Sequence, residues 1–306
     1  MSTHARAGRH LRRVIALAMT GAAALAFAGS SLAQTPVERG RYLVESILGC
    51  GNCHTPKSPD GGAIMERNLA GGITVTAPPF SGMASNITPD RETGIGSWTD
   101  AEIKRAIVDG VRPNHGRLPN TQLAAVMATP FFKAMLPRDL DAVIAYLRSV
   151  KPVRNETPPP VYRMPVHHDR YPEAEAGFTE AMMADPVRRG AYLVTIGHCM
   201  ECHTPREKGI SDYGKRLGAG GRVFDAQLVQ GFARDWPGSR TANITSHPGS
   251  GLGSWTDAEI RRAITQGISR DGRKLQPPMA FAWYARMTEA DVNAIVAYLR
   301  TVPPLE

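Results

Sequence analysis

Two short stretches of the chain combine thiols and an imidazole at a spacing that supports cofactor chemistry. In Cys50–His54 and in Cys199–His203, two cysteines lie three positions apart and a histidine follows directly. On one helical turn, both thiols reach the same edge of a flat ring, and the imidazole points at its centre. This pattern attaches a c-type haem by two thioether bonds. The pattern assigns iron ligation to His54 and His203. It assigns haem attachment to the four cysteines, Cys50, Cys53, Cys199 and Cys202.

Two other uses of paired cysteines fit the sequence less well. A four-cysteine zinc site would leave both adjacent histidines unexplained. A thioredoxin-like redox pair requires a βαβ context, which the surrounding sequence does not offer. The four cysteines are all used by the two motifs, so none remains for a disulfide. We therefore expect two covalently bound haem c groups.

The surroundings of the two motifs also recur, which indicates an internal repeat. Gly40–Val44 returns 150 positions later as Gly190–Val194, and Gly96–Ile103 returns 157 positions later as Gly253–Ile260. The stretch from Lys151 to Asp185 contains three consecutive prolines and is predicted to be a semi-rigid connector. The predicted organisation is a signal peptide at 1–33, a first domain at 34–152, a linker at 153–184 and a second domain at 185–306.

Helix signals dominate each repeat. Thr99 with Glu102, and Thr256 with Glu259, form capping boxes that open helices ending at glycines. The last helix of each repeat has apolar residues at i, i+3, i+4 and i+7. Gly- and Pro-rich stretches between the helices are predicted to be loops around the haem. The expected fold class is therefore all-α.

A low-spin electron-carrying haem needs a sixth ligand, and a methionine thioether raises its potential relative to a second histidine. Met279 follows two prolines, which stiffen the loop that would hold its sulfur, and Met127 precedes it by 152 positions. Both are predicted iron ligands, with His115 as a reserve in the first domain. His167 and His168 fall in the linker and are interpreted as a solvated pair.

The N-terminal segment is predicted to direct export. Four arginines precede an apolar run from Val14 to Ala28, and the Ser31-Leu32-Ala33 that follows is suited to signal peptidase. Removal of residues 1–33 takes away these four arginines and no acid, so the formal charge falls from +8 to +4. The basic pI of the full sequence thus gives no reason to expect nucleic-acid binding. We expect a periplasmic protein.

The paired haem motifs, the repeated Asn-Ile-Thr and Gly-Ser-Trp-Thr-Asp-Ala-Glu-Ile stretches, Pro-Pro-Met and the closing Ala-Tyr-Leu-Arg carry a family resemblance. The chain resembles bacterial dihaem class I cytochromes c, and especially the cytochrome c subunits of periplasmic alcohol, gluconate and molybdenum-hydroxylase dehydrogenases. The resemblance implies two tandem class I cytochrome c domains that relay electrons from a dehydrogenase to quinone, another cytochrome or an oxidase. The sequence contains no serine–histidine–acid set, paired-carboxylate motif or phosphate loop that would suggest separate catalysis, so we expect an electron-transfer protein.

The alternative function is that of a dihaem enzyme. A thiosulfate dehydrogenase of this kind uses a cysteine as distal haem ligand, and no cysteine is spare here. A dihaem peroxidase needs one haem open to peroxide, and the weak surroundings of Met127 leave this alternative open. Because the chain ends at Glu306, just after its last amphipathic helix, we expect membrane attachment only through a partner.

Overall fold

A computed structural model describes residues 34–114 and 122–306. The predicted signal peptide and His115 lie outside these residues. Within them, no helix combines the length and the apolar character that crossing a bilayer requires.

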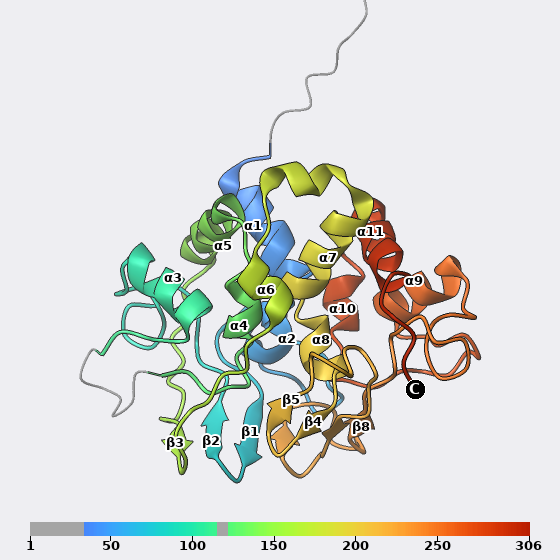
Figure 1. The fold of residues 1–306 in the computed structure, drawn as a ribbon. Helices are drawn as coiled ribbons and strands as arrows, with labels where there is room; N and C mark the ends of the chain where they lie inside the picture. The colour runs from blue at the N-terminus through green and yellow to red at the C-terminus, as the bar shows by residue number, and fades with distance from the viewer. Residues whose placement is uncertain (1–33, 115–121) are drawn as a thin grey trace, which may run out of the picture. The chain divides into compact units, whose positions relative to one another are not determined.

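The described residues of each half contain the same series of α-helices, and the first half adds a 3₁₀ helix (Figure 1). The first half, residues 34–152, contains α1 (Pro36–Glu45), α2 (Cys50–His54), the 3₁₀ helix η1 (Met65–Arg67), α3 (Asp100–Asp109), α4 (Thr129–Phe132) and α5 (Pro137–Ser149). The second half, residues 185–306, contains α7 (Pro186–Ile196), α8 (Cys199–His203), α9 (Asp257–Gln266), α10 (Phe281–Tyr284) and α11 (Glu289–Leu299). The connecting segment between them adds α6 (Pro172–Ala176) and the 3₁₀ helix η2 (Glu180–Ala184).

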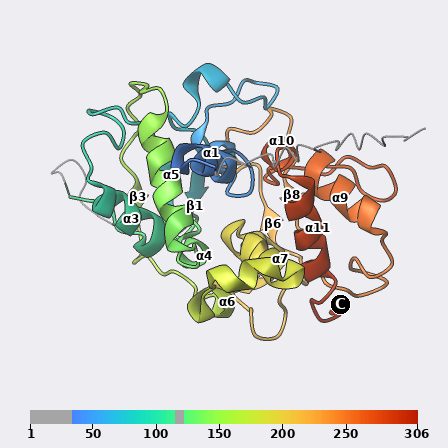
Figure 2. The same ribbon diagram turned by 90° about the horizontal axis from the view of Figure 1, so that it is seen from above.

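The first and last helices of each half pack closely, α1 against α5 and α7 against α11 (Figure 2). Glycines make these contacts possible. A Cβ atom at Gly40 would lie 1.9 Å from the carbonyl oxygen of Ala142, and one at Gly190 would lie 1.9 Å from that of Ala294. The repeated glycine of the two stretches Gly40–Val44 and Gly190–Val194 is thus a requirement of helix packing.

The capping boxes form as the sequence predicts. Thr99 accepts a hydrogen bond from the backbone N–H of Glu102, whose carboxylate accepts one in return, and Thr256 and Glu259 do the same. Both helices end at a glycine with φ of 67°, a left-handed conformation that suits a residue without Cβ. These signals position α3 and α9 in the two halves.

The prediction of an all-α fold is wrong, because the described residues also contain three small antiparallel sheets. The largest has the order β3-β2-β1-β7 and joins both halves to the connecting segment; its strands are β1 (Thr74–Ala77), β2 (Phe80–Met83), β3 (Val161–Tyr162) and β7 (Val229–Gln230). The others pair β4 (Arg206–Glu207) with β5 (Ile210–Ser211), and β6 (Val223–Phe224) with β8 (Ser239–Arg240).

The register of the large sheet shows how distant segments are joined. Val75 lies opposite Gly82, Thr74 opposite Gln230, and Ser81 opposite Val161. The strands have two to four residues, too few to show the alternating pattern that reveals a strand in a sequence. The glycines and prolines that surround these strands are typical of loops, although the backbone of the strands pairs with segments far away in the sequence.

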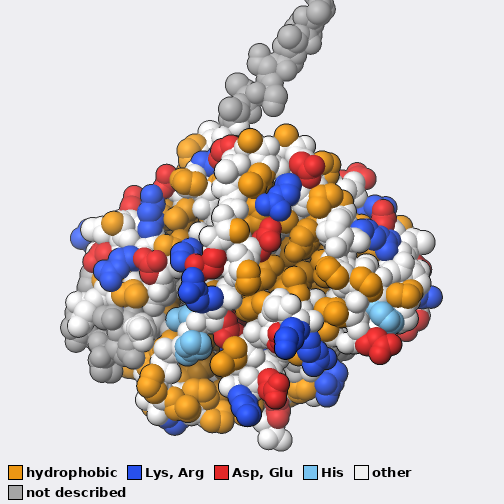
Figure 3. Space-filling view, viewed as in Figure 1, with side chains coloured by type: hydrophobic (Ala, Val, Ile, Leu, Met, Phe, Trp, Pro, Cys, Tyr) orange, Lys and Arg blue, Asp and Glu red, His pale blue; other side chains and the backbone are white. Residues whose placement is uncertain are grey.

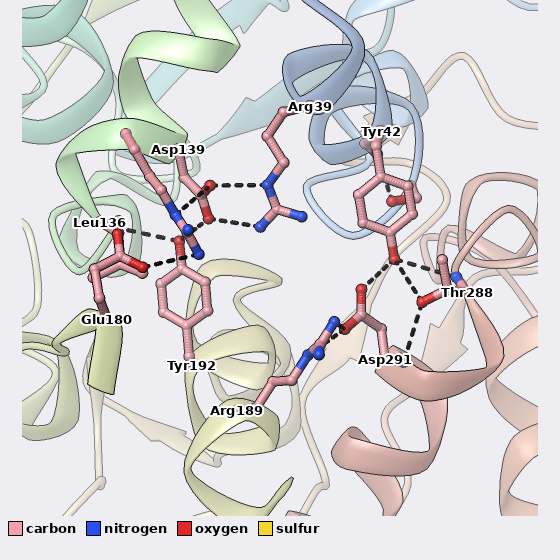
Figure 4. Close-up of polar contacts among 11 residues, drawn as sticks. Arg39, Tyr42, Leu136, Asp139, Glu180, Arg189, Tyr192, Thr288 and Asp291 are labelled. Carbon is pink, nitrogen blue, oxygen red and sulfur yellow. Dashed lines mark hydrogen bonds and ion pairs between the residues drawn. The ribbon is translucent and has the colours of Figure 1, made fainter. Parts of the chain in front are cut away.

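Two polar networks join the halves (Figure 4). Tyr192 donates a hydrogen bond to Asp139 (2.7 Å), which also accepts two bonds from Arg39 at 2.9 and 2.8 Å. In the second network the halves exchange roles: Tyr42 of the first half donates a hydrogen bond to Asp291 of the second half, and Arg189 also contacts this aspartate. Each aspartate therefore binds an arginine of its own half and a tyrosine of the other.

The apolar core is continuous across the same boundary. One cluster of buried residues runs from Leu43 in α1 to Val302 beyond α11 and includes Tyr171 of the connecting segment. Residues 34–306 form one compact unit in which both halves share this core. The residue boundaries of the two domains stay a prediction from the sequence.

Candidate haem-binding sites

The two motifs form short helical turns, α2 and α8, directly after the first helix of each half. The residue before each first cysteine has a left-handed backbone: Gly49 has φ of 55° and His198 has φ of 43°. This sharp change of direction turns the motif away from the preceding helix. Burial raises the pKa of the Cys50 thiol and that of the Cys199 thiol to about 12. In this apolar setting the free thiols stay neutral.

A backbone carbonyl fixes the orientation of each motif histidine. Nδ1 of His54 lies 2.7 Å from the carbonyl oxygen of Ser85, and Nδ1 of His203 lies 2.7 Å from that of Ala242. A carbonyl only accepts, so each Nδ1 carries the proton and donates it, which leaves Nε2 with a free lone pair. Burial lowers the pKa of both histidines, against a smaller opposing effect of these hydrogen bonds. Both imidazoles are neutral at pH 7, the form that binds iron.

Sequence reasoning missed the residues that hold those carbonyls in place. The Oδ1 atom of Asn86 accepts a bond from the backbone N–H of Thr88 (3.0 Å), and its Nδ2 donates to the carbonyl of Val153 (2.7 Å). Asn243 repeats both contacts, with Thr245 and with the carbonyl of Leu305. The available signal was the recurrence of Asn-Ile-Thr one residue after each carbonyl. Each asparagine therefore fixes the backbone next to the carbonyl that orients the histidine of its motif.

Glycines allow a neighbouring loop to bring its backbone close to each motif. The backbone N–H of Gly71 donates to the carbonyl of His54 (2.8 Å), and that of Gly220 donates to the carbonyl of His203 (2.7 Å). A Cβ atom at Gly72 would lie 2.0 Å from the carbonyl oxygen of Cys53, so only glycine fits there. Glycines at equivalent places in the two halves therefore support the turns that carry the motifs.

Each motif also contacts the opposite half. Asn52, inside the first motif, donates to the carbonyl of Pro278 (2.6 Å), and a Cβ atom at Gly51 would lie 2.7 Å from Nε1 of Trp283. On the other side, the Phe132 ring packs edge-on against His198, which precedes the second motif. Each motif region is therefore contacted by residues of the opposite half.

Tyr284 lies between the two motifs. Its ring carbon Cε1 is 4.0 Å from a Cβ atom built on Gly49. Burial raises the pKa of Tyr284 well above its ordinary value, and ionisation of the nearby thiols of Cys199, Cys202 and Cys53 would raise it further. Thiols of both motifs are therefore close to one buried side chain. The structure brings the two predicted haem turns together in the interior.

The two predicted methionine ligands occupy equivalent positions. The carbonyl of Met127 accepts a bond from the N–H of Thr129 (2.7 Å), and that of Met279 accepts one from Phe281 (3.0 Å). Both methionines are half-buried against the main core. A short helix, α4 or α10, begins within two residues of each. The alignment that paired the two methionines is thus reproduced by the backbone.

The histidines of the connecting segment differ from each other. His167 is exposed, as predicted for a solvated pair, but His168 is half-buried with Nδ1 3.3 Å from the hydroxyl of Thr129.

A different cluster, formed by His198, Glu201 and Cys202, has the geometry of a cation site. Cys202 belongs to the second haem motif, so this cluster is part of the site already described.

The motifs and the geometry of their histidines are those expected of a c-type cytochrome. Residues 187–303 match the cytochrome c family, and most of the chain is similar to cytochrome c subunits of bacterial dehydrogenases. It is similar to the cytochrome c subunit of a quinone-dependent alcohol dehydrogenase from Gluconacetobacter polyoxogenes, at 33% identity over 91% of this chain and 59% of the relative.

Two further relatives extend the comparison. The gluconate 2-dehydrogenase cytochrome c subunit of Pantoea cypripedii is 27% identical over 95% of this chain and 65% of its own length. A protein named as a dihaem c-type cytochrome, from Cereibacter sphaeroides, is 26% identical over 84% of this chain and 83% of its own length. The chain spans 59% of the first dehydrogenase subunit, which is therefore the longer protein.

Proposed function

We propose that this chain is a periplasmic dihaem cytochrome that relays single electrons from a partner dehydrogenase toward the respiratory chain. The observation that carries the proposal is the duplicated motif in which each histidine offers a free Nε2 to a metal. The names of the relatives as cytochrome c subunits of dehydrogenases support the choice of donor. Quinone, another cytochrome or an oxidase would be the acceptor.

The chain's residues fit two haem groups. The two cysteines of each motif lie on one helical turn, as two thioether bonds to one ring would require, and the Nδ1 of each histidine is hydrogen-bonded to a backbone carbonyl. When bound, the haem supplies the one-electron chemistry. The protein's contribution is to bind the two rings, exclude water with the shared apolar core and keep the two motifs close on either side of Tyr284.

We further propose Met127 and Met279 as the sixth ligands, His54 and His203 being the fifth. The near-infrared charge-transfer band of the oxidised holoprotein, which reports methionine bound to iron, should weaken in Met127→Ala and in Met279→Ala. Added imidazole should displace Met127 first, because no proline stiffens the segment before it. Met135→Ala is the control, since Met135 is buried in the core. An unchanged band and potential in Met127→Ala would exclude Met127 as a ligand.

The relay function makes a separate prediction about turnover. A redox titration of the holoprotein should take up two electrons per chain in one-electron steps. With peroxide or thiosulfate the purified protein should turn over more slowly than about 1 s⁻¹, below the range of ordinary enzymes. Rapid reduction by a dehydrogenase from the same gene neighbourhood would identify the donor. Enzymic rates with peroxide or thiosulfate would instead establish the protein as a dihaem enzyme.

A further inference from the structure

The two haem turns are flanked by segments of different charge. Residues 55–84 lead from His54 to its carbonyl partner and contain two basic and two acidic residues, a net charge of zero. Residues 204–241 make the same connection for His203 and contain seven basic and four acidic residues, a net charge of +3. Each haem would add two propionates to its own site, so haem binding leaves the difference in net charge between the two segments unchanged. The second site is the more positive one.

Three of the basic residues are exposed in the loops of this segment, where the exposed acid Glu207 lies next to the first of them; we call these three the basic patch: Lys208, Lys215 and Arg216. Lys208 lies in the turn between β4 and β5, and the other two lie in the loop that follows β5. None of the three forms an ion pair within the described parts of the chain. Figure 3 shows basic side chains below α8 and around β4 and β5, where Figure 1 places this loop, with acidic side chains between them. Their charge is therefore directed at solvent.

An apolar side chain lies within the same loop. Ile210, in β5 and two residues from Lys208, is 58% exposed, which is unusual for an isoleucine. Transient protein interfaces combine a small apolar centre with a charged or polar rim. The basic patch around Ile210 has this composition.

The loop that carries the patch is fixed to the haem turn. The N–H of Gly218 donates to the hydroxyl of Thr204, and Arg222 donates from Nη1 to the carbonyl of Glu201, inside the motif. At the other end, the Ser211 hydroxyl donates to Asp169 of the connecting segment (2.7 Å). Hydrogen bonds therefore hold the patch at a constant position beside the second haem.

From these observations we propose that the basic patch is the docking surface for an acidic electron-transfer protein, which exchanges electrons with the haem attached at Cys199 and Cys202. The proposal rests on the relay function proposed above. The positive potential speeds the approach of an acidic partner and orients it with Ile210 at the centre of contact. The neutral segment of the first half provides no such attraction, so the two haems meet different partners.

The test compares two reductants of opposite charge on the oxidised holoprotein by stopped-flow spectroscopy. The protein probe is a reduced flavodoxin with an acidic surface, and the small probe is the hexaammineruthenium(II) cation. In Lys208→Glu/Lys215→Glu/Arg216→Glu, reduction by flavodoxin at low salt should be about tenfold slower, and its dependence on ionic strength should flatten. Reduction by the ruthenium cation should be unchanged or faster.

The matched control is Arg91→Glu/Arg105→Glu/Lys151→Glu. These three residues are exposed in the first half, and the substitutions change the net charge by the same six units. The control should keep most of the wild-type rate with flavodoxin. If flavodoxin reduced the two triple variants at equal rates and with equal salt dependence, the proposed docking surface would be refuted. The proposed relay function would be unaffected by that result. A purified chain without haem, or one that neither reagent reduces, would refute the relay itself.

Discussion

The denatured mature chain should carry two haem masses, and removing either cysteine pair should remove one of them completely. Cys50→Ser/Cys53→Ser and Cys199→Ser/Cys202→Ser each eliminate both thioether bonds of one motif, so neither chain can retain that ring through denaturation. Mass spectrometry of the unfolded protein counts the haems directly. The mass should also correspond to a chain beginning near Gln34, as cleavage after the predicted signal peptide requires.

Single-pair variants serve as each other's controls, because the motifs lie in equivalent surroundings. We expect both to lose stability as well as haem, since a ring missing from the shared core leaves a cavity next to Tyr284. Bound zinc in place of haem, or a wild-type chain with only one haem, would contradict the assignment of the two motifs.

Loss of the buried aspartate in the first network should produce the largest stability change outside the haem sites. The side chain of Asp139 is fully buried and is bound by Arg39 and Tyr192. Asp139→Ala leaves Arg39 without its partner in a mostly buried position, which costs about 3–5 kcal/mol. Urea unfolding of the holoprotein should show the change as a lower midpoint. Asp141→Ala, on the same helix, removes an exposed pair with Lys104 and should cost less than about 1 kcal/mol.

The contribution of Asp139 should also depend on pH. Burial by itself would raise the pKa of Asp139, but hydrogen bonds and charge from Arg39 outweigh it and hold the pKa below its usual value. A carboxyl whose pKa is depressed by folding stabilises the protein above its unfolded pKa of about 3.9 and loses that effect as pH falls through the folded pKa. The difference between wild type and Asp139→Asn should therefore be full at pH 7 and shrink below about pH 4. An equal difference at pH 7 and pH 3 would show that Asp139 acts only by packing.

Residue type and spacing carried enough information to predict the haem motifs, the capped helices and the pairing of Met127 with Met279. These features are local, or repeat in the sequence, and each follows from short-range geometry. The carbonyls of Ser85 and Ala242 could not be predicted in the same way, because every residue has a carbonyl and its direction is set by the fold. The recurrence of Asn-Ile-Thr directly after each of these residues was the only sequence signal that indicated their importance.

The strands and the contacts between the two halves also could not be predicted from the sequence. A two-residue strand such as β3 has no periodicity, and its partner Ser81 lies 80 positions away from Val161. Tyr42 and Tyr192 look like helix residues of their own halves, yet both hydroxyls bind aspartates of the opposite half. A repeat in a sequence shows that two units exist, but it does not show which surfaces they turn toward each other.

Those reciprocal tyrosine–aspartate contacts have the form of an isologous dimer interface, in which residue i of one unit meets residue j of the other and the reverse. Here the two units are one polypeptide, joined by residues 153–184. Their association is governed by an effective concentration that the connector sets, and the amount of protein in solution does not enter. The pair of haem turns consequently stays assembled at any dilution, whereas two separate subunits would come apart.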